Sequence, residues 1–281
     1  EYMSTHASPQ GGGRRPAQAK PDRHFVTALA RGLEVLSVFR ARDHLLGNQE
    51  LARRSGLPKS TISRLTYTLT RLGYLEHAQD ERGNVGYRLG SAVLALGSTM
   101  LSRMDLRAVA RPLMQELADH SQAMVALGTR DRLSMIYVET CRSESALTLS
   151  LEVGSRIPLG TTAMGRAYLA VCSEVERRAL MEQMRERDPD RWPVVEAGIL
   201  RGLEEYRRMG CCASFGEWQS DVNALAIAFR PLAGRGIMGI NCGGPAFQLA
   251  PDYLLREVRP LLVTMGERLQ QLGAVKPMGP A

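Results

Sequence analysis

The sequence predicts an α+β chain of two domains, an N-terminal winged helix-turn-helix and a C-terminal antiparallel sheet with flanking helices. Two short helical patterns meet across a turn at residues 55–57, and a strand, turn and strand pattern follows at 76–89. Beyond residue 105 the order is helix, three strands, helices, three strands and helix. Alternating apolar residues indicate the strands, and apolar residues three and four apart indicate the helices. This order favours an antiparallel α+β domain at the C-terminal end.

The length and composition fit a soluble two-domain protein. With 281 residues, 44% of them hydrophobic, the chain is long enough for two cores. No apolar run approaches the ~20 residues that cross a bilayer, and the N-terminal segment lacks the apolar core of a signal peptide. We therefore expect a cytoplasmic protein without a membrane partner. The expected division is a disordered tail at 1–22, the winged helix-turn-helix at 23–91, a linker helix at 92–104, a second domain at 105–273 and a C-terminal tail at 274–281.

The helix-turn-helix pattern is NQELARRSGLPKSTISRLTYTLTRLGYL, residues 48–75. Asn48 is a suitable N-cap for the first helix, because its side-chain oxygen can accept a free backbone N–H. Gly56 can adopt the left-handed conformation that ends a helix, and Pro58 opens the second helix, where a missing N–H costs nothing. The second helix is expected to bury four residues three and four apart, namely Ile62, Leu65, Leu69 and Leu72.

The opposite face of the second helix carries short hydroxyls and long cations. Such side chains suit a helix whose N-terminal half enters a DNA major groove. For a lone helix, a solvated amphipathic face is the better interpretation. The hairpin that follows changes this balance, because helix, turn, helix and hairpin is the order of a winged helix-turn-helix, with Gly83 and Asn84 in the turn. The candidate DNA-binding residues are Lys59, Ser60, Thr61, Ser63, Arg64, Tyr67 and, near the wing tip, Arg82.

Two elements flank this unit. The pattern over 25–39 predicts a helix that packs behind the helix pair, and Leu45 and Leu46 are expected to add a short strand to the wing. Residues 92–104 predict a helix with too few polar residues for a solvated linker, so it should pack on a partner. The alternative is that this helix packs on its own domain.

In the second domain, Pro112 should kink or break a helix over 105–122. Thr161 or Thr162 is a natural N-cap, and the free N–H groups that follow can hold a carboxylate or phosphate. Ser173 and Glu176 form a capping box that opens a further helix. The expected strands are 123–128, 133–140, 146–151, 211–218, 223–231 and 237–243, and the later helices are 173–187, 192–209 and 250–272.

Positive charge is concentrated in the N-terminal third. Residues 1–91 contain 14 Lys or Arg and 8 Asp or Glu, a net charge of +6, whereas 92–281 contain 22 and 21, a net charge of +1. A basic domain beside a helix-turn-helix favours a polyanionic partner. A small basic excess also serves solubility alone.

The five cysteines have no metal-site spacing. They are odd in number, lack a CxxC motif and have no nearby His, which argues against a disulfide framework and a structural zinc site. An enzyme with Cys211 or Cys212 as a thiol nucleophile, or with His120 as a base, remains an alternative hypothesis. We expect no metal, no cofactor and no catalytic activity.

Four blocks resemble the IclR family of bacterial transcriptional regulators: RGLEVL at 31–36, ELARRSGLPKST at 50–61, RLGYL at 71–75 and GSRIPLGTTAMGRAYLA at 154–170. The resemblance spans roughly 24–273. It implies a GAF-like or profilin-like effector-binding domain, a double-stranded DNA operator, a small organic acid effector with an apolar or aromatic body, and self-association into dimers and dimers of dimers. By the same resemblance, the effector pocket would contain Leu149, Ile157, Ala163, Met164, Ser214, Val222, Ala224, Asn241 and Gly243.

The first hypothesis is thus a transcriptional regulator whose operator affinity or activity responds to a small organic acid. The enzyme above is a second. A third is a DNA-binding protein without any ligand.

Overall fold

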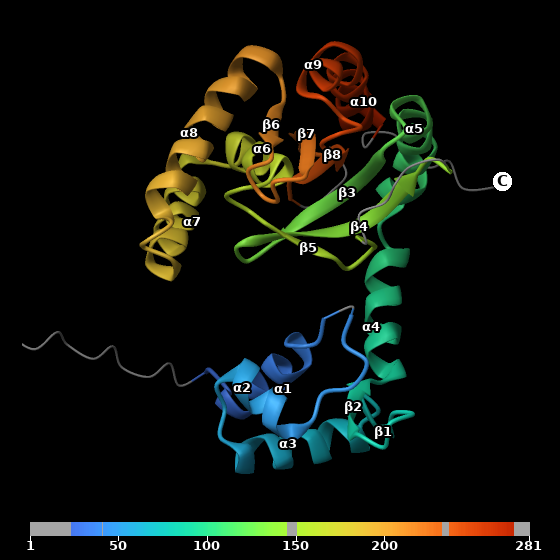
Figure 1. Ribbon diagram of the computed structural model, residues 1–281, viewed down its shortest axis with the longest axis vertical. Coiled ribbons are helices and arrows are strands. Elements are labelled where there is room, and N and C mark those ends of the chain that lie inside the picture. The colour runs from blue at the N-terminus through green and yellow to red at the C-terminus, as the bar shows by residue number, and fades with distance from the viewer. Residues whose placement is uncertain (1–23, 41, 145–150, 232–235, 273–281) are drawn as a thin grey trace, which may run out of the picture. The chain divides into compact units, whose positions relative to one another are not determined.

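The chain forms two compact units that meet between Leu96 and Gly97. The structure is a computed structural model that describes residues 24–40, 42–144, 151–231 and 236–272. The predicted tails and most of the predicted strand 146–151 lie outside the described residues. The boundary falls within helix α4 (Ser91–Ser102), the predicted linker helix (Figure 1).

The N-terminal unit has the predicted winged helix-turn-helix fold. Leu46 joins the two-stranded wing hairpin through a single β-bridge, in which its N–H and C=O both bond to Tyr87 at 2.9 Å. The core consists of Val35, Leu46, Leu51, Ile62, Leu69 and Leu75. The elements of this unit are α1 (Thr27–Ser37), α2 (Asn48–Ser55), α3 (Lys59–Arg71), β1 (Leu75–Gln79) and β2 (Val85–Leu89).

Two local predictions about this unit were wrong. The N-cap of α2 is Gly47 rather than Asn48, and no side chain caps the helix. On α3, Leu72 is 60% exposed because the helix ends at Arg71, while Thr66 takes a buried position and donates to Ile62 O. Helix α1 packs behind the helix pair as predicted, with Val35 in the core and Leu36 against it, while Leu29 and Leu33 remain exposed.

A six-stranded antiparallel sheet forms the centre of the C-terminal unit. Its order is β5-β4-β3-β8-β7-β6, so the two sequence halves contribute three strands each and join where β3 pairs with β8. The third strand of the first half is the short β5, which lies outside the six predicted strands. The strands are β3 (Met124–Asp131), β4 (Ser134–Arg142), β5 (Arg156–Pro158), β6 (Cys212–Phe215), β7 (Val222–Phe229) and β8 (Met238–Pro245).

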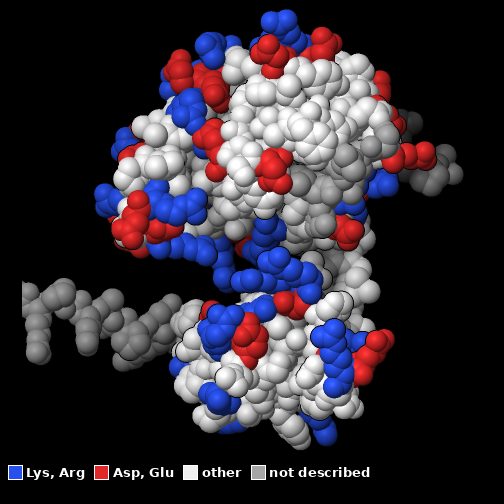
Figure 2. All heavy atoms as spheres, in the orientation of Figure 1, with Lys and Arg blue, Asp and Glu red and all other residues white. Residues whose placement is uncertain are grey.

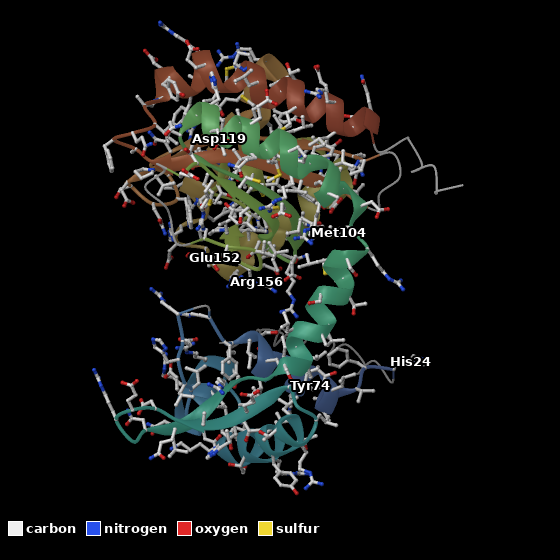
Figure 3. The ribbon with its side chains drawn as sticks, turned by 90° about the vertical axis from the view of Figure 1, so that its right-hand side faces the viewer. His24, Tyr74, Met104, Asp119, Glu152 and Arg156 are labelled. Carbon is white, nitrogen blue, oxygen red and sulfur yellow. The ribbon has the colours of Figure 1, made fainter. Side chains whose placement is uncertain are left out.

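Helices cover both faces of this sheet. Helices α5 (Asp105–Ser121) and α10 (Arg259–Leu272) pack on one face, and Figure 3 shows α5 between the labelled Met104 and Asp119. The other face carries α6 (Ala163–Val171), with α8 (Trp192–Met209) packed on α6 and α7 (Glu174–Arg187) beside α8. A short helix α9 (Pro251–Tyr253) and a π-helical segment (Leu254–Val258) lead into α10.

Two prolines have different effects on the helices. Helix α5 runs through Pro112 without the predicted break. By contrast, the π-helical segment comes directly before Pro260, whose missing N–H removes one α-helical hydrogen bond.

A β-bulge in β4 decides which face its side chains reach. Opposite Leu127 and Gly128, the register skips from Glu139 to Tyr137, which leaves Val138 as the extra residue. Tyr137 belongs to the core under α6, whereas Val138 and Glu139 both face α5. Glu139 there pairs with Arg107 at 3.1 Å and Arg111 at 2.8 Å.

The start of α6 lies directly on the chain that precedes it. A Cβ atom added at Gly165 would be 2.0 Å from the carbonyl oxygen of Leu159 and 2.5 Å from its carbonyl carbon. Both are backbone atoms, so relieving the clash would require the backbone to move. We expect Gly165→Ala to destabilise the C-terminal unit by about 3 kcal/mol, despite the better helix propensity of Ala. Denaturant unfolding of the purified protein measures this effect.

Gly97→Ala is the matched control, because a Cβ there meets no atom within 4 Å. That variant should be neutral or stabilised by up to about 1 kcal/mol. Equal unfolding midpoints for Gly165→Ala and the wild type would contradict this packing.

Candidate functional site

The outer face of α3 is polar, exposed and free of acidic residues. Of the seven candidate DNA-binding residues, Thr61 is half-buried and the other six are exposed, with Tyr67 at 66%. In Figure 2 the lower edge of the N-terminal unit, where α3 runs in Figure 1, shows blue and white atoms. Gly56 ends α2 in the left-handed conformation, with its N–H bonded to Ala52 O at 2.9 Å, and α3 begins three residues later at Lys59. The sequence-predicted turn therefore presents the N-terminal half of α3 to solvent.

Ser63 also links the two helices. Its hydroxyl donates to Lys59 O at 3.1 Å and accepts from Asn48 Nδ2 at 3.4 Å. Asn48, predicted as a cap, thus connects α2 to α3 instead. A substitution of Ser63 would change both this link and any contact to DNA, whereas Arg64 has no such second role among the bonds of the described residues.

Asp80 organises the turn of the wing. Its carboxylate accepts from the backbone N–H groups of Arg82 at 2.9 Å and Asn84 at 2.8 Å. The side chain of Asn84 also donates to this carboxylate, and this bond is the largest cause of a pKa of Asp80 below its ordinary value. The backbone bonds from Asn84 and Arg82 lower the pKa further. Gly83 adopts φ +84° within the turn. The side chain of Arg82 is therefore carried on an ordered turn with its cation in solvent.

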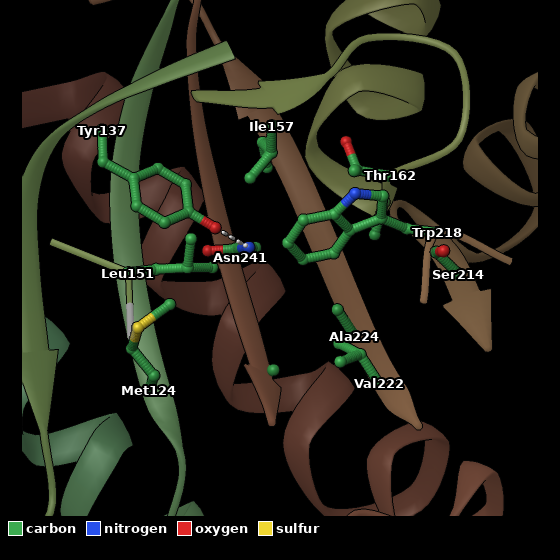
Figure 4. Close-up of a pocket in the computed structure, with 12 residues that line it drawn as sticks. Met124, Tyr137, Leu151, Ile157, Thr162, Ser214, Trp218, Val222, Ala224 and Asn241 are labelled. Carbon is green, nitrogen blue, oxygen red and sulfur yellow. Dashed lines mark hydrogen bonds between the residues drawn. The ribbon is translucent and has the colours of Figure 1, made fainter. Parts of the chain in front are cut away.

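A pocket lies in the C-terminal unit between the sheet and the start of α6. The open space between its lining residues is about 380 Å³, which includes volume continuous with solvent. Figure 4 shows an apolar middle between the polar pair of Tyr137 and Asn241 at one end and Thr162 with Ser214 at the other. The lining residues are Met124, Tyr137, Leu151, Ile157, Thr162, Ala163, Ser214, Trp218, Val222, Ala224, Asn241 and Gly243.

The N-terminus of α6 supplies main-chain donors to this pocket. Thr162 is the N-cap, as predicted, and its hydroxyl oxygen accepts from Gly165 N at 3.2 Å while donating to Pro158 O at 2.6 Å. The N–H groups of Ala163 and Met164 donate to no acceptor within the described part of the chain. Such free N–H groups, together with the helix dipole, favour an anion.

Arg166, the fourth residue of α6, is a buried cation with a full set of partners. It is 2% exposed and donates to Gly160 O and Ala213 O, each at 3.1 Å. Its guanidinium also forms a double hydrogen bond to Glu217 at 2.8 and 3.0 Å. Burial raises the pKa of Glu217, but Arg166 and then Arg201 outweigh it and hold the pKa below its ordinary value.

This ion pair holds the loop that carries Trp218 over the pocket. The strand predicted over 211–218 is shorter in the structure. Strand β6 ends at Phe215, because Gly216 turns the chain with φ +68°. Glu217 is then tied to Arg166, and its neighbour Trp218 becomes a pocket wall.

The predicted pocket residues lie mostly together. Seven of the nine line the pocket. Leu149 lies outside the described residues, and the Met164 side chain packs in the core against Gly128 and Gly239, so its contribution at the pocket is confined to its N–H. The sequence analysis missed Met124, Tyr137, Leu151, Thr162 and Trp218 as lining residues. Thr162 had a signal of its own as an N-cap, whereas Tyr137 depends on the bulge.

The residues of the enzyme alternative lack the expected environment. Cys211 and Cys212 are buried, and burial raises the pKa of the Cys211 thiol to about 11 and that of Cys212 further. A nucleophilic thiol needs a lowered pKa. Within the described ranges, no three His, Cys, Asp or Glu residues gather as metal ligands, and no helix is long and apolar enough to span a bilayer.

Comparison with known proteins gives consistent relatives over nearly the whole chain. A curated relative is the HTH-type transcriptional regulator TsaQ1/TsaQ2 of Comamonas testosteroni, 34% identical over 90% of this chain and 91% of that protein. The Pca regulon regulatory protein of Pseudomonas putida is 25% identical over 88% of this chain and 84% of that protein.

The solved structures agree with this. A crystal structure of an IclR family transcriptional regulator from Brucella abortus is 44% identical, covers 92% of this chain and 96% of that one, and has a TM-score of 0.79. An IclR homologue from Microbacterium hydrocarbonoxydans, crystallised with 4-hydroxybenzoate, shares the fold with 23% identity, a TM-score of 0.64 and coverage of 87% and 99%.

Two family models match in the expected order. The IclR helix-turn-helix domain matches residues 28–79, and the bacterial transcriptional regulator IclR C-terminal domain matches 98–270. The chain therefore belongs to the IclR family of DNA-binding bacterial transcriptional regulators.

Proposed function

We propose that α3 enters the major groove of an operator and reads it with its outer face, while the wing contacts the phosphate backbone. The observation that carries this proposal is the exposed outer face of α3, which has cations and hydroxyls and no acidic residue. Arg can bond guanine edges and Ser or Thr can bond bases or phosphates. The proposed contacts are Lys59, Ser60, Thr61, Ser63, Arg64 and Tyr67 on α3 and Arg82 on the wing.

We further propose that the pocket binds a small organic acid effector. Its acid group would lie at the N-terminus of α6, where Ala163 and Met164 present N–H groups, and its body would fill the apolar middle beside Trp218 and Ile157. A mostly apolar lining with a few polar groups is typical of small-molecule sites.

Self-association is the third part of the proposal. The N-terminal unit exposes large apolar side chains on two of its helices, and contiguous exposed apolar surface typically indicates an interface. Dimers would place two α3 helices in successive major grooves, about 34 Å apart. The exposed residues are Phe25 and Val26 just before α1, Leu29 and Leu33 on α1, and Leu94 and Leu96 on α4. A dimer of dimers through the C-terminal units completes the proposed assembly.

Regulation would follow from linkage between the two sites. An effector that binds one arrangement of the dimer more tightly shifts operator affinity by a coupling free energy of typically ~1–3 kcal/mol. The operator affinity of the proposed regulator would therefore change with the concentration of the acid.

Arg64→Ala should weaken binding to the operator by about 1–3 kcal/mol, because a base contact is lost. The difference in affinity between the operator and non-specific DNA should therefore decrease. Arg82→Ala should instead weaken binding to all sequences alike and lower the slope of log K against log salt by about 1. Fluorescence anisotropy on operator and scrambled duplexes at several salt concentrations separates the two.

Arg31→Ala, which removes the same charge from an exposed position on α1, is the control and should change operator binding little. If Arg31→Ala and Arg64→Ala had equal effects, α3 would not be the reading element.

A saturating acid should raise the melting temperature of the wild type by a few degrees, since a ligand at ~100 times its Kd adds about 2.7 kcal/mol to stability. Ala224→Phe should abolish this rise, because the added ring fills the pocket that Ala224 lines. Thermal-shift assays with a panel of monocarboxylic acids measure both, and Ala108→Phe, on the exposed side of α5, is the control. An unchanged rise in Ala224→Phe would place the binding site elsewhere.

Leu94→Glu should shift the dimer toward monomer, because Leu94 is 72% exposed in the single chain and a carboxylate would be buried in the interface. Sedimentation velocity gives the mass. Val175→Glu, at a residue 81% exposed on α7, is the control and should not produce monomers. A dimer that survives Leu94→Glu unchanged would exclude α4 from the interface.

A further inference from the structure

One end of the pocket is formed by two buried polar groups that are only partly satisfied. Asn241 Nδ2 donates to Tyr137 Oη at 3.0 Å. Within the described part of the chain, Asn241 Oδ1 accepts no hydrogen bond, although the residue is only 6% exposed. A buried amide oxygen without a donor is costly and uncommon in folded proteins. In this chain the atom lies in the wall of a pocket, where a bound molecule can supply the missing donor.

The hydroxyl of Tyr137 provides the complementary group. It accepts from Asn241, and its own proton has no acceptor among the hydrogen bonds of the described residues. Burial raises the pKa of Tyr137 to about 12, so the proton stays on the oxygen at neutral pH. The pair thus presents one open donor and one open acceptor side by side. Turning the amide by half a rotation exchanges the roles of its oxygen and nitrogen and leaves the same two kinds of open position.

The surroundings of this pair exclude a charged group. None of the described residues that line the pocket is Asp, Glu, Lys or Arg, and Figure 4 shows the apolar Leu151 and Ile157 and the ring of Trp218 around the pair. A second carboxylate or an ammonium group placed here would be buried without a counter-charge. An alkyl group placed here would displace solvent from the pair. It would then leave the hydroxyl proton of Tyr137 and Oδ1 of Asn241 without a hydrogen-bond partner.

We propose that the effector carries, at the end opposite its acid group, an uncharged group that both donates and accepts a hydrogen bond, and that Asn241 and Tyr137 select for it. A hydroxyl on the ring or chain of a monocarboxylic acid is the simplest such group. This inference rests on the proposed function, since it takes the pocket to be the effector site. It narrows the effector class from organic acids in general to hydroxy-acids, and it disfavours dicarboxylates.

Isothermal titration of the full-length protein with meta- and para-hydroxybenzoate and with the methylbenzoates of the same geometry tests the preference. A hydroxyl and a methyl group are nearly equal in size, so the comparison isolates the hydrogen bonds. We expect at least one hydroxybenzoate to bind about 10- to 100-fold more tightly than its methyl counterpart, the range expected when buried polar groups are left unpaired.

Asn241→Leu should remove this preference, so that the methyl compound binds as tightly as the hydroxyl compound or more tightly. Tyr137→Phe deletes a single oxygen and should reduce the preference as well. It decides the question if Asn241→Leu does not fold. Tyr206→Phe is the control, because Tyr206 is another largely buried tyrosine, whose hydroxyl donates to Ala228 O outside the pocket, and it should leave the preference unchanged.

The outcomes separate the two levels of the proposal. Saturable binding of both compounds with affinities within about threefold in the wild type would overturn the hydroxyl inference and leave the acid effector in place. A preference that persists in both pocket variants would overturn the role of this residue pair. If none of these acids bound at all, the acid effector itself would be refuted, and the inference with it.

Discussion

The C-terminal unit depends on keeping one buried cation satisfied. An unpaired guanidinium in the interior would cost several kcal/mol, so the chain has to bring acceptors to Arg166 from separate segments. These are Gly160 before α6, Ala213 on β6 and Glu217 after it. On α8, Gly198 and Gly202 leave the space that the side chain needs, since a Cβ at either would approach Arg166 closely. Satisfying one charge thus fixes α6, α8 and the loop over the pocket relative to the sheet.

The bulge in β4 has a similar organising effect on the opposite side of the pocket. One extra residue allows Tyr137 to face α6 and Glu139 to face α5, although only Val138 separates them. Glu139 then joins Arg107 and Arg111 near the start of α5, and Arg107 also reaches the carbonyl of Leu101 at the end of α4. The strand that carries a pocket wall is therefore bonded to the end of the linker helix through an ion pair from Glu139 to Arg107 and a hydrogen bond from Arg107 to Leu101 O.

Local signals predicted most elements well, and long-range geometry decided what they missed. Helix α8 was predicted with its observed bounds, Trp192–Met209, because a proline near its start and the left-handed Gly210 at its end are signals within the sequence itself. The family resemblance located most of the pocket. Trp218 was assigned to a strand, but Gly216 ends that strand early, and the ion pair of Glu217 with Arg166, fifty-one residues away, then holds Trp218 in a loop. Likewise, nothing local in the sequence indicates that a bulge turns Tyr137 toward Asn241.

The two ends of the pocket differ in how they would hold a ligand, and the reason again lies in Arg166. Although this cation sits in the first turns of α6, its charge is matched by Glu217 and by two carbonyls, so little of it remains to attract an acid. The acid end is left with main-chain N–H groups and a helix dipole, whose contribution is typically ~0.3–1 kcal/mol for each charge near the terminus. Attraction of this size gives moderate affinity and little discrimination among acids. Selectivity then has to come from the neutral end, where an unsatisfied amide oxygen penalises every ligand that fails to pair with it. If the pocket binds the proposed effector, such a sensor would release it readily when its concentration falls and would still distinguish it from other acids of the same size.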